Sequence, residues 1–350
     1  MENTAQAIVG ELKIKVVQAD LPKEVSEKLT NLLRFPLSMA EFGGLIAYID
    51  FVISLPFSKM ATDILDIDRA RKILDKNHFG LQSVKDRILE YLSILILHKR
   101  SFVGSMPPQD EAKLRFHAPI LAFIGLVGTG KTSLAYSIAE VLGRPLVRIP
   151  FGGLGDPVSL RGQSRLRADA EPGQIIKAIK AAKVSNPVIL LDEIDRVALE
   201  HRVDMMGVLV ELLDPAQNQA FLDHYLDFPY DLSQVLFIAT ANNTGQLATA
   251  VMDRLEPIQM PSYSDSEKEA IGQNYLLPKA MDEAGIDQES LQIDETVWPA
   301  IIRPLGYDGG IRSLSRSLQT VCRKVARKLV EGEGGPFKIT LESLGEYLQG

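Results

Sequence analysis

The chain has 350 residues, of which 46% are hydrophobic and 24% charged, and a formal net charge of −7. This composition is ordinary for a globular protein with a sizeable core, with room for two or three domains. An acidic chain without a basic tail is a poor candidate for a nucleic-acid binder. The single cysteine, Cys322, excludes an intramolecular disulfide and a multi-cysteine zinc site, and it favours a reducing, intracellular compartment.

Neither a membrane span nor a targeting segment is apparent. The longest apolar stretch, 42–57, contains Asp50 and is shorter than the ~20 residues that a spanning helix needs. The N-terminus lacks the basic start and apolar core of a signal peptide. We therefore expect no membrane association, and a location in the cytosol or in a mitochondrial or peroxisomal matrix.

The predicted elements fall into three parts. Residues 1–62 predict a short helical N-terminal segment, with Pro22 in the first turn of one helix and a later helix from about Met39 to Ser54. Residues 63–262 predict an α/β domain. Residues 263–350 predict a small, mainly helical domain that contains one short strand at 338–340.

Strands and helices alternate in the middle part. Two helices, at 65–74 and 84–97, precede a polar, proline-bearing stretch at 100–117 that predicts a surface loop. Short apolar runs then predict buried strands at 119–124, 146–149, 188–191 and 235–240, with helices at 131–142, 172–184 and 204–213. Such alternation is typical of a parallel sheet that helices cover on both faces.

Residues 125–132 match the phosphate-binding pattern G-x-x-x-x-G-K-[ST] and lie between a predicted strand and a predicted helix. A chance glycine-rich turn would lack this context. Glycines let backbone N–H groups surround phosphate oxygens, while Lys131 would reach the β- and γ-phosphates and the Thr132 hydroxyl would bind Mg²⁺. The candidate ATP-binding residues of this phosphate loop are Gly125, Gly128, Thr129, Gly130, Lys131, Thr132 and Ser133.

Two carboxylates, Asp192 and Glu193, follow the predicted strand 188–191. At the carboxyl edge of a parallel sheet they would reach a bound nucleotide. Asp192 would hold Mg²⁺ and Glu193 would activate the water that attacks the γ-phosphate, because this chemistry depends on positioning and charge neutralisation. The alternative, a solvated acidic turn, is disfavoured by the phosphate loop upstream.

Three further side chains are candidates for the hydrolysis site. Asn242 follows the strand 235–240 and could hydrogen-bond the attacking water, although asparagine is also common in turns that end strands. Arg254 could stabilise the transition state in a neighbouring subunit, and Arg312 could report the nucleotide state to the last domain. A surface salt bridge for Arg254 and a solvated helix end for Arg312 are the open alternatives.

Together these motifs resemble the AAA+ ATPase module of the Lon protease family. The resemblance is carried by Leu65-Asp-Ile-Asp-Arg-Ala-Arg-Lys-Ile-Leu-Asp75, by Leu190-Leu-Asp-Glu-Ile-Asp195 and, most specifically, by the run 213–242, and it extends from about residue 20 to the end of the chain. The family implies a hexameric ring, a homo-oligomer that hydrolyses ATP with Mg²⁺ to pull a protein substrate through a central pore.

The resemblance also implies a role for each matching position. Phosphate and Mg²⁺ would be bound by Lys131, Thr132 and Asp192, and Glu193 would be the base. Asn242 would be the first sensor, Arg254 the finger that acts on a neighbour's ATP, and Arg312 the second sensor. The adenine would lie against the stretch His78, Phe79 and Gly80.

Two departures from the family pattern concern loops. Leu126 and Val127 replace two prolines of the phosphate loop and leave its fixed positions intact. In the pore loop, 161–173, the aromatic–aliphatic pair that grips the substrate falls on Arg167 and Ala168, which cannot grip apolar side chains as an aromatic ring does. Either this is drift in an exposed loop, or the ring does not thread generic polypeptide, or it grips acidic segments.

The third departure is that the family's proteolytic domain, with its Ser–Lys dyad, does not occur in these 350 residues, so we expect no protease activity from this chain alone. The main expectation is a Mg²⁺-dependent AAA+ ATPase that acts as a chaperone in protein quality control. One alternative is the ATPase part of a longer Lon-type serine protease. The other is a nucleotide-binding regulator or scaffold with little turnover.

Overall fold

The computed structural model describes residues 2–34, 39–102, 120–167, 169–303 and 309–348. Within these ranges the central sheet has five parallel strands in the order β2-β3-β6-β1-β7. Their bounds are β1 (Ile120–Ile124), β2 (Leu146–Pro150), β3 (Val188–Asp192), β6 (Leu236–Ala241) and β7 (Leu255–Gln259). The predicted α/β fold with a parallel sheet is confirmed.

Strand β7 was not predicted. Its sequence, Leu255-Glu-Pro-Ile-Gln259, contains a charged residue and a proline, which argues against a buried strand. The structure places it at the edge of the sheet, where only β1 pairs with it. A proline is tolerated there because no further strand needs its missing N–H group.

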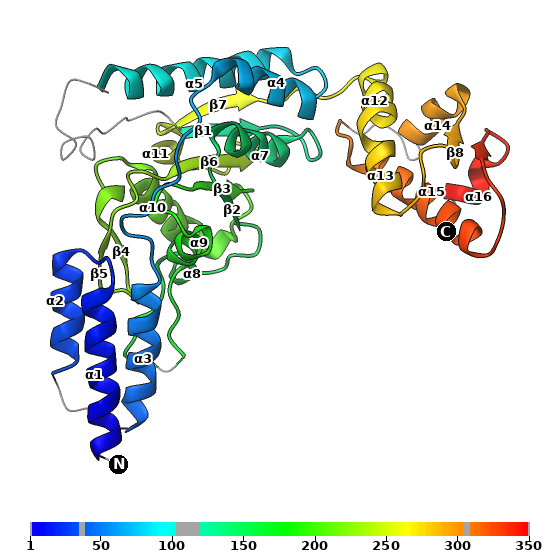
Figure 1. The fold of residues 1–350 in the computed structure, drawn as a ribbon. Helices are drawn as coiled ribbons and strands as arrows, with labels where there is room; N and C mark the ends of the chain where they lie inside the picture. The colour runs from blue at the N-terminus through cyan, green and yellow to red at the C-terminus, as the bar shows by residue number, and fades with distance from the viewer. Residues whose placement is uncertain (1, 35–38, 103–119, 168, 304–308, 349–350) are drawn as a thin grey trace.

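Helices cover both faces of the sheet, as Figure 1 shows. Because side chains alternate along a strand, Leu121 and Phe123 of β1 face one layer and Ala122 faces the other. The first layer consists of α4 (Ile67–Asn77), α5 (Gln82–Phe102) and α7 (Lys131–Leu142). The second contains α8 (Val158–Arg161), α9 (Gln174–Ala182), α10 (Arg202–Leu213) and α11 (Thr249–Met252).

Helix α5 is longer than expected, so the prediction of a loop from residue 100 was wrong for 100–102, which continue the helix. The rest of that expected loop, 103–117, lies outside the described residues. No helix among the described residues is long and apolar enough to cross a membrane.

The N-terminal segment forms three helices, α1 (Glu2–Gln18), α2 (Lys23–Leu32) and α3 (Met39–Ile53). They pack against an antiparallel hairpin of β4 (Phe221–Asp223) and β5 (Phe228–Tyr230), on the side away from α4 and α5 (Figure 1). The Tyr48 hydroxyl donates to the Leu226 carbonyl at 2.7 Å. The rings of Tyr48 and Phe51 each meet Tyr225 edge-on at 5.7 Å.

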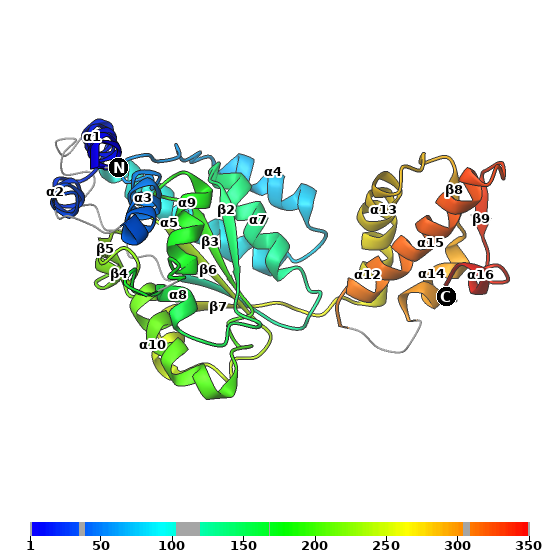
Figure 2. The same cartoon turned by 90° about the horizontal axis from the view of Figure 1, so that it is seen from below.

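The C-terminal part has its own apolar core around Trp298, Leu318 and Ile339, and Figure 2 shows it at one end of the sheet domain. Its helices are α12 (Asp265–Ile271), α13 (Leu277–Glu283), α14 (Trp298–Ile302), α15 (Arg312–Val330) and α16 (Leu344–Leu348). The predicted strand appears as β9 (Phe337–Ile339), and it pairs in parallel with β8 (Leu291–Ile293), which was not expected. The domain boundaries at 62/63 and 262/263 stay predictions.

The segment 161–173, which we call the pore-loop segment, is closed at its base by hydrogen bonds. The Gln163 N–H donates to the Glu171 carbonyl at 3.0 Å. The fully buried Asp223 carboxylate accepts from the Gly173 N–H at 2.8 Å and from two N–H groups of its own hairpin, those of Tyr225 and Leu226. The hairpin therefore sets where this segment leaves the domain.

We predict that Gly173→Ala destabilises the protein, because a Cβ there would lie 2.0 Å from the Leu160 carbonyl oxygen. Overpacking of this kind costs roughly 1–3 kcal/mol. Gly207→Ala is the matched control. Gly207 is exposed within α10, and an added Cβ meets nothing within 4 Å. The control should be stabilised by about 0.5–1 kcal/mol through helix propensity. Urea unfolding measures both, and equal shifts would contradict the prediction.

Candidate functional site

The phosphate loop leaves β1 at the carboxyl edge of the sheet and enters α7, which begins at Lys131. The Gly125 N–H donates to the Ala241 carbonyl of β6 at 3.2 Å. A Cβ on Gly125 would lie 2.8 Å from the Cβ of Met260, and Gly128 has a φ of +82°, so both positions require glycine. The strand–loop–helix arrangement therefore has the geometry that the motif predicted.

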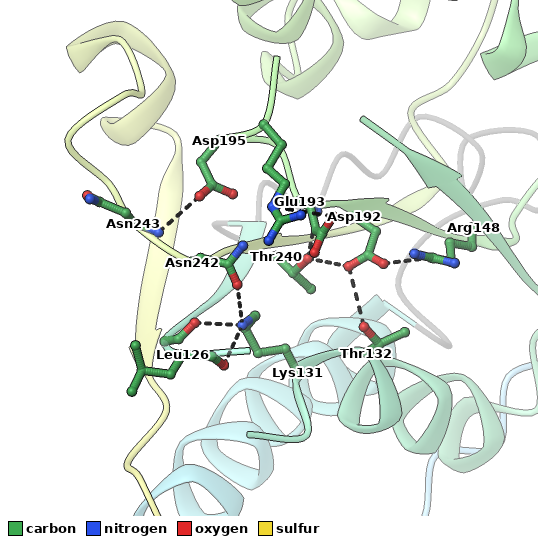
Figure 3. A network of polar contacts seen from close by, with 12 residues as sticks. Leu126, Lys131, Thr132, Arg148, Asp192, Glu193, Asp195, Thr240, Asn242 and Asn243 are labelled. Atoms are coloured by element: carbon green, nitrogen blue, oxygen red, sulfur yellow. Dashed lines mark hydrogen bonds and ion pairs between the residues drawn. The ribbon is translucent and has the colours of Figure 1, made fainter. Parts of the chain in front are cut away.

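Lys131 lies buried inside this loop (Figure 3). Its Nζ donates to the carbonyls of Gly125 at 2.6 Å and Leu126 at 2.9 Å, and to Asn242 Oδ1 at 2.9 Å. Burial lowers the pKa of Lys131, and the carboxylates of Asp195 and Asp192 oppose this shift. A bound phosphate would take the place of the carbonyl oxygens as acceptor and would restore the preference for the charged amine.

Asp192, at the end of β3, is the most connected carboxylate of the site. Its Oδ1 accepts from the Thr240 hydroxyl of β6 and, at 3.4 Å, from the Thr132 hydroxyl of α7. Its Oδ2 accepts from Arg148 Nε of β2 at 2.6 Å. Figure 3 shows these groups converging on one carboxylate. Thr132 and Asp192 present adjacent hard oxygen donors, so this pair fits a Mg²⁺ ion.

Glu193 begins the turn after β3 with a φ of +57°, an uncommon conformation for a residue other than glycine. Its backbone N–H donates to Thr240 Oγ1 at 2.8 Å, which fixes the start of this turn. Its carboxylate lies 3.6 Å from Arg196 Nε. One oxygen of the Glu193 carboxylate is therefore engaged in a weak ion pair.

Asn242 lies beside Lys131, and Asp195 lies beyond it, next to Asn243 (Figure 3). Asp195 Oδ2 accepts from the Asn243 N–H at 3.1 Å. Two buried atoms, Asn242 Nδ2 and Asp195 Oδ1, have no hydrogen-bond partner among the described residues. An unsatisfied donor on the amide whose oxygen binds the lysine amine is suited to an oxygen of an incoming phosphate or water.

The last domain contacts the phosphate loop directly. The Ile311 N–H donates to the Gly128 carbonyl at 3.0 Å, and the Tyr263 hydroxyl donates to the Thr129 carbonyl at 3.3 Å. Arg312, the exposed first residue of α15, lies so close that a Cβ on Gly128 would be 3.1 Å from its Cβ. The structure thus places the backbone and Cβ of Arg312 against the phosphate loop.

Two other predicted loop residues have local partners. The Thr129 hydroxyl donates to the Leu126 carbonyl at 2.9 Å, and the Ser133 hydroxyl donates to the Gly130 carbonyl at 2.8 Å. Both side chains therefore support the shape of the phosphate loop.

Arg254 is not part of this cluster. The Ile120 N–H donates to the Arg254 carbonyl at 3.3 Å, which puts Arg254 at the amino end of β1. At ~3.3 Å per residue the phosphate loop begins, at Gly125, roughly 17 Å away, beyond the other end of that strand. Arg254 Nη2 donates to Asp214 Oδ2 at 2.8 Å, and this bond holds the pKa of Asp214 below its usual value.

The predicted adenine stretch lies between α7 and α12. His78 is the C-cap residue that follows α4, and its Nε2 is 2.9 Å from Ser137 Oγ of α7. Phe79 packs against the first helical layer, and a Cβ on Gly80 would lie 3.4 Å from Glu267 of α12. Burial, together with the nearby Lys85, lowers the pKa of His78 to about 4, so the imidazole is neutral at pH 7.

The comparisons with known proteins decide the family. A sequence profile of the "ATPase family associated with various cellular activities (AAA)" matches residues 121–263, and one of the "Lon protease AAA+ ATPase lid domain" matches residues 282–337. The chain is an AAA+ ATPase module of the Lon protease family.

Curated relatives of this Lon-type module are similar in sequence to nearly the whole chain. A Lon protease of Lawsonia intracellularis is 43% identical over 94% of the chain. A Lon protease of Geobacter metallireducens and Lon protease 2 of Thermus thermophilus are each 40% identical over 97% of it. The chain covers 38%, 40% and 42% of these three proteins, that is, about two fifths of their length.

Sequence reasoning missed two residues of this Lon-type site, Thr240 and Arg148. Each carried a signal. Thr240 is a polar residue near the end of β6, two positions before Asn242. Arg148 is a lone charge within the apolar run Leu146-Val-Arg-Ile149. Neither signal shows which carboxylate the side chain meets, because that depends on the order of the strands.

The lowered pKa of His78 predicts a pH dependence. Because the folded pKa of about 4 lies below the unfolded value of 6.5, the folded state binds fewer protons in this window, and stability falls as the pH drops through it. The full shift in the pKa of His78 corresponds to on the order of 3 kcal/mol in the free energy of unfolding.

Urea midpoints between pH 7 and pH 5 test this expectation. The urea midpoint of His78→Gln should fall less steeply with decreasing pH than that of the unmodified protein. His224→Gln changes an exposed histidine, and its urea midpoint should follow that of the unmodified protein. Identical slopes in all three proteins would contradict the expectation.

Proposed function

We propose that this Lon-type module hydrolyses ATP with Mg²⁺ and uses the reaction to remodel or unfold protein substrates. One observation carries the proposal: Lys131, Thr132, Asp192, Glu193 and Asn242 converge at the carboxyl edge of the sheet, although they come from three separate stretches of sequence. A chain selected only to scaffold a partner has no need for this arrangement of a buried cation and paired carboxylates.

The residues would divide the work of phosphoryl transfer between them. Lys131 and the loop N–H groups would bind the phosphates. Mg²⁺, held by Thr132 and Asp192, would neutralise charge on the phosphate oxygens. Glu193 would take a proton from the attacking water, and Asn242 would orient that water with the amide donor that is buried and unsatisfied in this structure.

We also propose that the module works as a homo-oligomeric ring, as the hexamer implied by the family resemblance would. Arg254 supports this proposal because it lies at the opposite end of β1 from its own phosphate loop. If it stabilises a transition state, that transition state belongs to a neighbouring subunit. Such fingers raise turnover by roughly 10³–10⁵.

The pore-loop segment supports a narrower choice of substrate. Leu166 is 87% exposed and Arg167 is exposed, while Ala168 lies outside the described residues. Arg165 lies over the Tyr48 ring at 5.0 Å, and Arg161 pairs with Glu211. Arg167 has no ion-pair partner among the described residues and lines a cavity of about 360 Å³. We propose that this ring grips acidic segments rather than apolar ones.

A second candidate function is the ATPase part of a longer Lon-type protease. The observation behind it is that relatives named as proteases share this chain along about two fifths of their length. Whether the reading frame continues past Gly350 decides between the two. The relatives are bacterial, which gives no support to a location in an organelle matrix. An intracellular location stays a prediction, and so does the lack of proteolysis by these 350 residues.

We expect Glu193→Gln to lower steady-state ATP hydrolysis at least about 100-fold, because a general base contributes 10²–10⁴ in rate. Nucleotide affinity should stay within about threefold, since the phosphates are held by other groups. Glu200→Gln, an exposed change seven residues on, is the control and should hydrolyse normally. Equal turnover in all three proteins would refute the assignment of the base, and none in any would favour the scaffold.

We expect Arg167→Tyr to increase unfolding of a substrate with an apolar tag, because an aromatic ring can grip apolar side chains. The unmodified protein should instead prefer a glutamate-rich tag. The assay follows loss of fluorescence from a tagged, folded substrate, with ATP hydrolysis measured in parallel to show that the site is intact. Robust unfolding of the apolar-tagged substrate by the unmodified protein would end this proposal.

A further inference from the structure

Arg148 lies on β2, at the edge of the sheet opposite β7. In the register of β2 and β3 it stands beside Leu190, so its side chain shares a face with Leu190 and, two residues on, with Asp192. Its neighbours in the strand are apolar and pack into the domain. The strand thus delivers one cation to the end of β3.

The ion pair between Arg148 and Asp192 is strongly asymmetric. The side chain of Asp192 is 4% exposed, whereas that of Arg148 is 48% exposed. Arg148 Nε binds Oδ2 at 2.6 Å and leaves Oδ1 to Thr240 and Thr132 (Figure 3). The carboxylate is therefore fixed with one oxygen facing Thr132, on the side where the proposed metal would be held.

The charge of Arg148 has opposite effects on the binding of a divalent cation and on the binding of ATP. A guanidinium in contact with Asp192 offsets the negative charge that attracts a divalent cation, and it also repels that cation. The same positive charge attracts an ATP polyanion. Arg148 is exposed enough to swing away, so it does not block the metal sterically.

We propose that Arg148 is a positioning residue that makes metal binding depend on the nucleotide. It holds the Asp192 carboxylate in place and keeps the affinity of the empty site for divalent cations low. A nucleotide then brings the negative charge that makes the metal site favourable. This inference rests on the proposed function, because it concerns the same phosphate and metal site.

The test compares Arg148→Gln with the unmodified protein in two binding measurements that need no turnover. One is Mn²⁺ binding without nucleotide, followed by electron paramagnetic resonance of the free ion. The other is binding of a fluorescent ATP analogue in EDTA. Loss of the charge should tighten Mn²⁺ binding about tenfold and weaken metal-free nucleotide binding about three- to tenfold. Arg148→Lys, which keeps the charge, should stay within about threefold in both.

Arg87→Gln is the matched control. Arg87 is 49% exposed and pairs with Glu256 of the other edge strand at 2.9 Å, so this variant removes a comparable ion pair far from Asp192. It should change neither affinity. Urea midpoints of all variants test whether they fold. We expect Arg148→Gln to fold, because Arg148 is half-exposed on an edge strand.

The expected changes in Mn²⁺ affinity and nucleotide affinity have opposite signs, which distinguishes an electrostatic role of Arg148 from a purely structural one. If Arg148→Gln weakens both ligands, Arg148 only supports the fold of the site, and the proposal is wrong. Unchanged affinities would overturn it as well. If the two affinities shift as expected but the unmodified protein hydrolyses no ATP, the inference stands and the proposed function fails.

Discussion

The site depends on how the buried carboxylate of Asp192 is satisfied. A carboxylate taken out of water is costly unless hydrogen bonds and a counter-charge replace its hydration. Here the replacements come from three elements that surround the end of β3: Thr240 of β6, Arg148 of β2 and Thr132 of α7. The position of this one carboxylate is therefore linked to the relative placement of two strands and a helix.

The phosphate loop depends in turn on the lid, because the lid meets it through backbone. A Cβ on Gly310 would lie 2.3 Å from the Val127 carbonyl oxygen, and Ile311 donates to Gly128. The backbone of the phosphate loop is therefore in direct contact with the start of α15, the longest helix of the lid.

The pore-loop segment is held from the other side of the sheet. Asp223 fixes its base and Arg165 stacks on Tyr48 of α3, so the hairpin and the N-terminal helices both contact it. Its position is thus set by parts of the chain that contribute nothing to the phosphate site. This separation lets the segment carry Arg167, where the family pattern has an aromatic residue, without any change at Lys131 or Asp192.

The sequence by itself determined the strand–loop–helix of the phosphate site, four of the five sheet strands and the carboxylates at the end of β3. These features are local, because glycine spacing, apolar runs and the residue after a strand are all read within a few positions. Strand β7 escaped notice because its proline and glutamate look unlike a buried strand.

The tertiary structure alone decided which groups meet. It brought Arg148 and Thr240 to Asp192, placed Arg254 at the far end of β1, and set Arg312 against Gly128. The order β2-β3-β6-β1-β7 differs from the order along the chain. Which strands become neighbours depends on how the crossover helices pack against the sheet. A local pattern of residues carries no information about this packing.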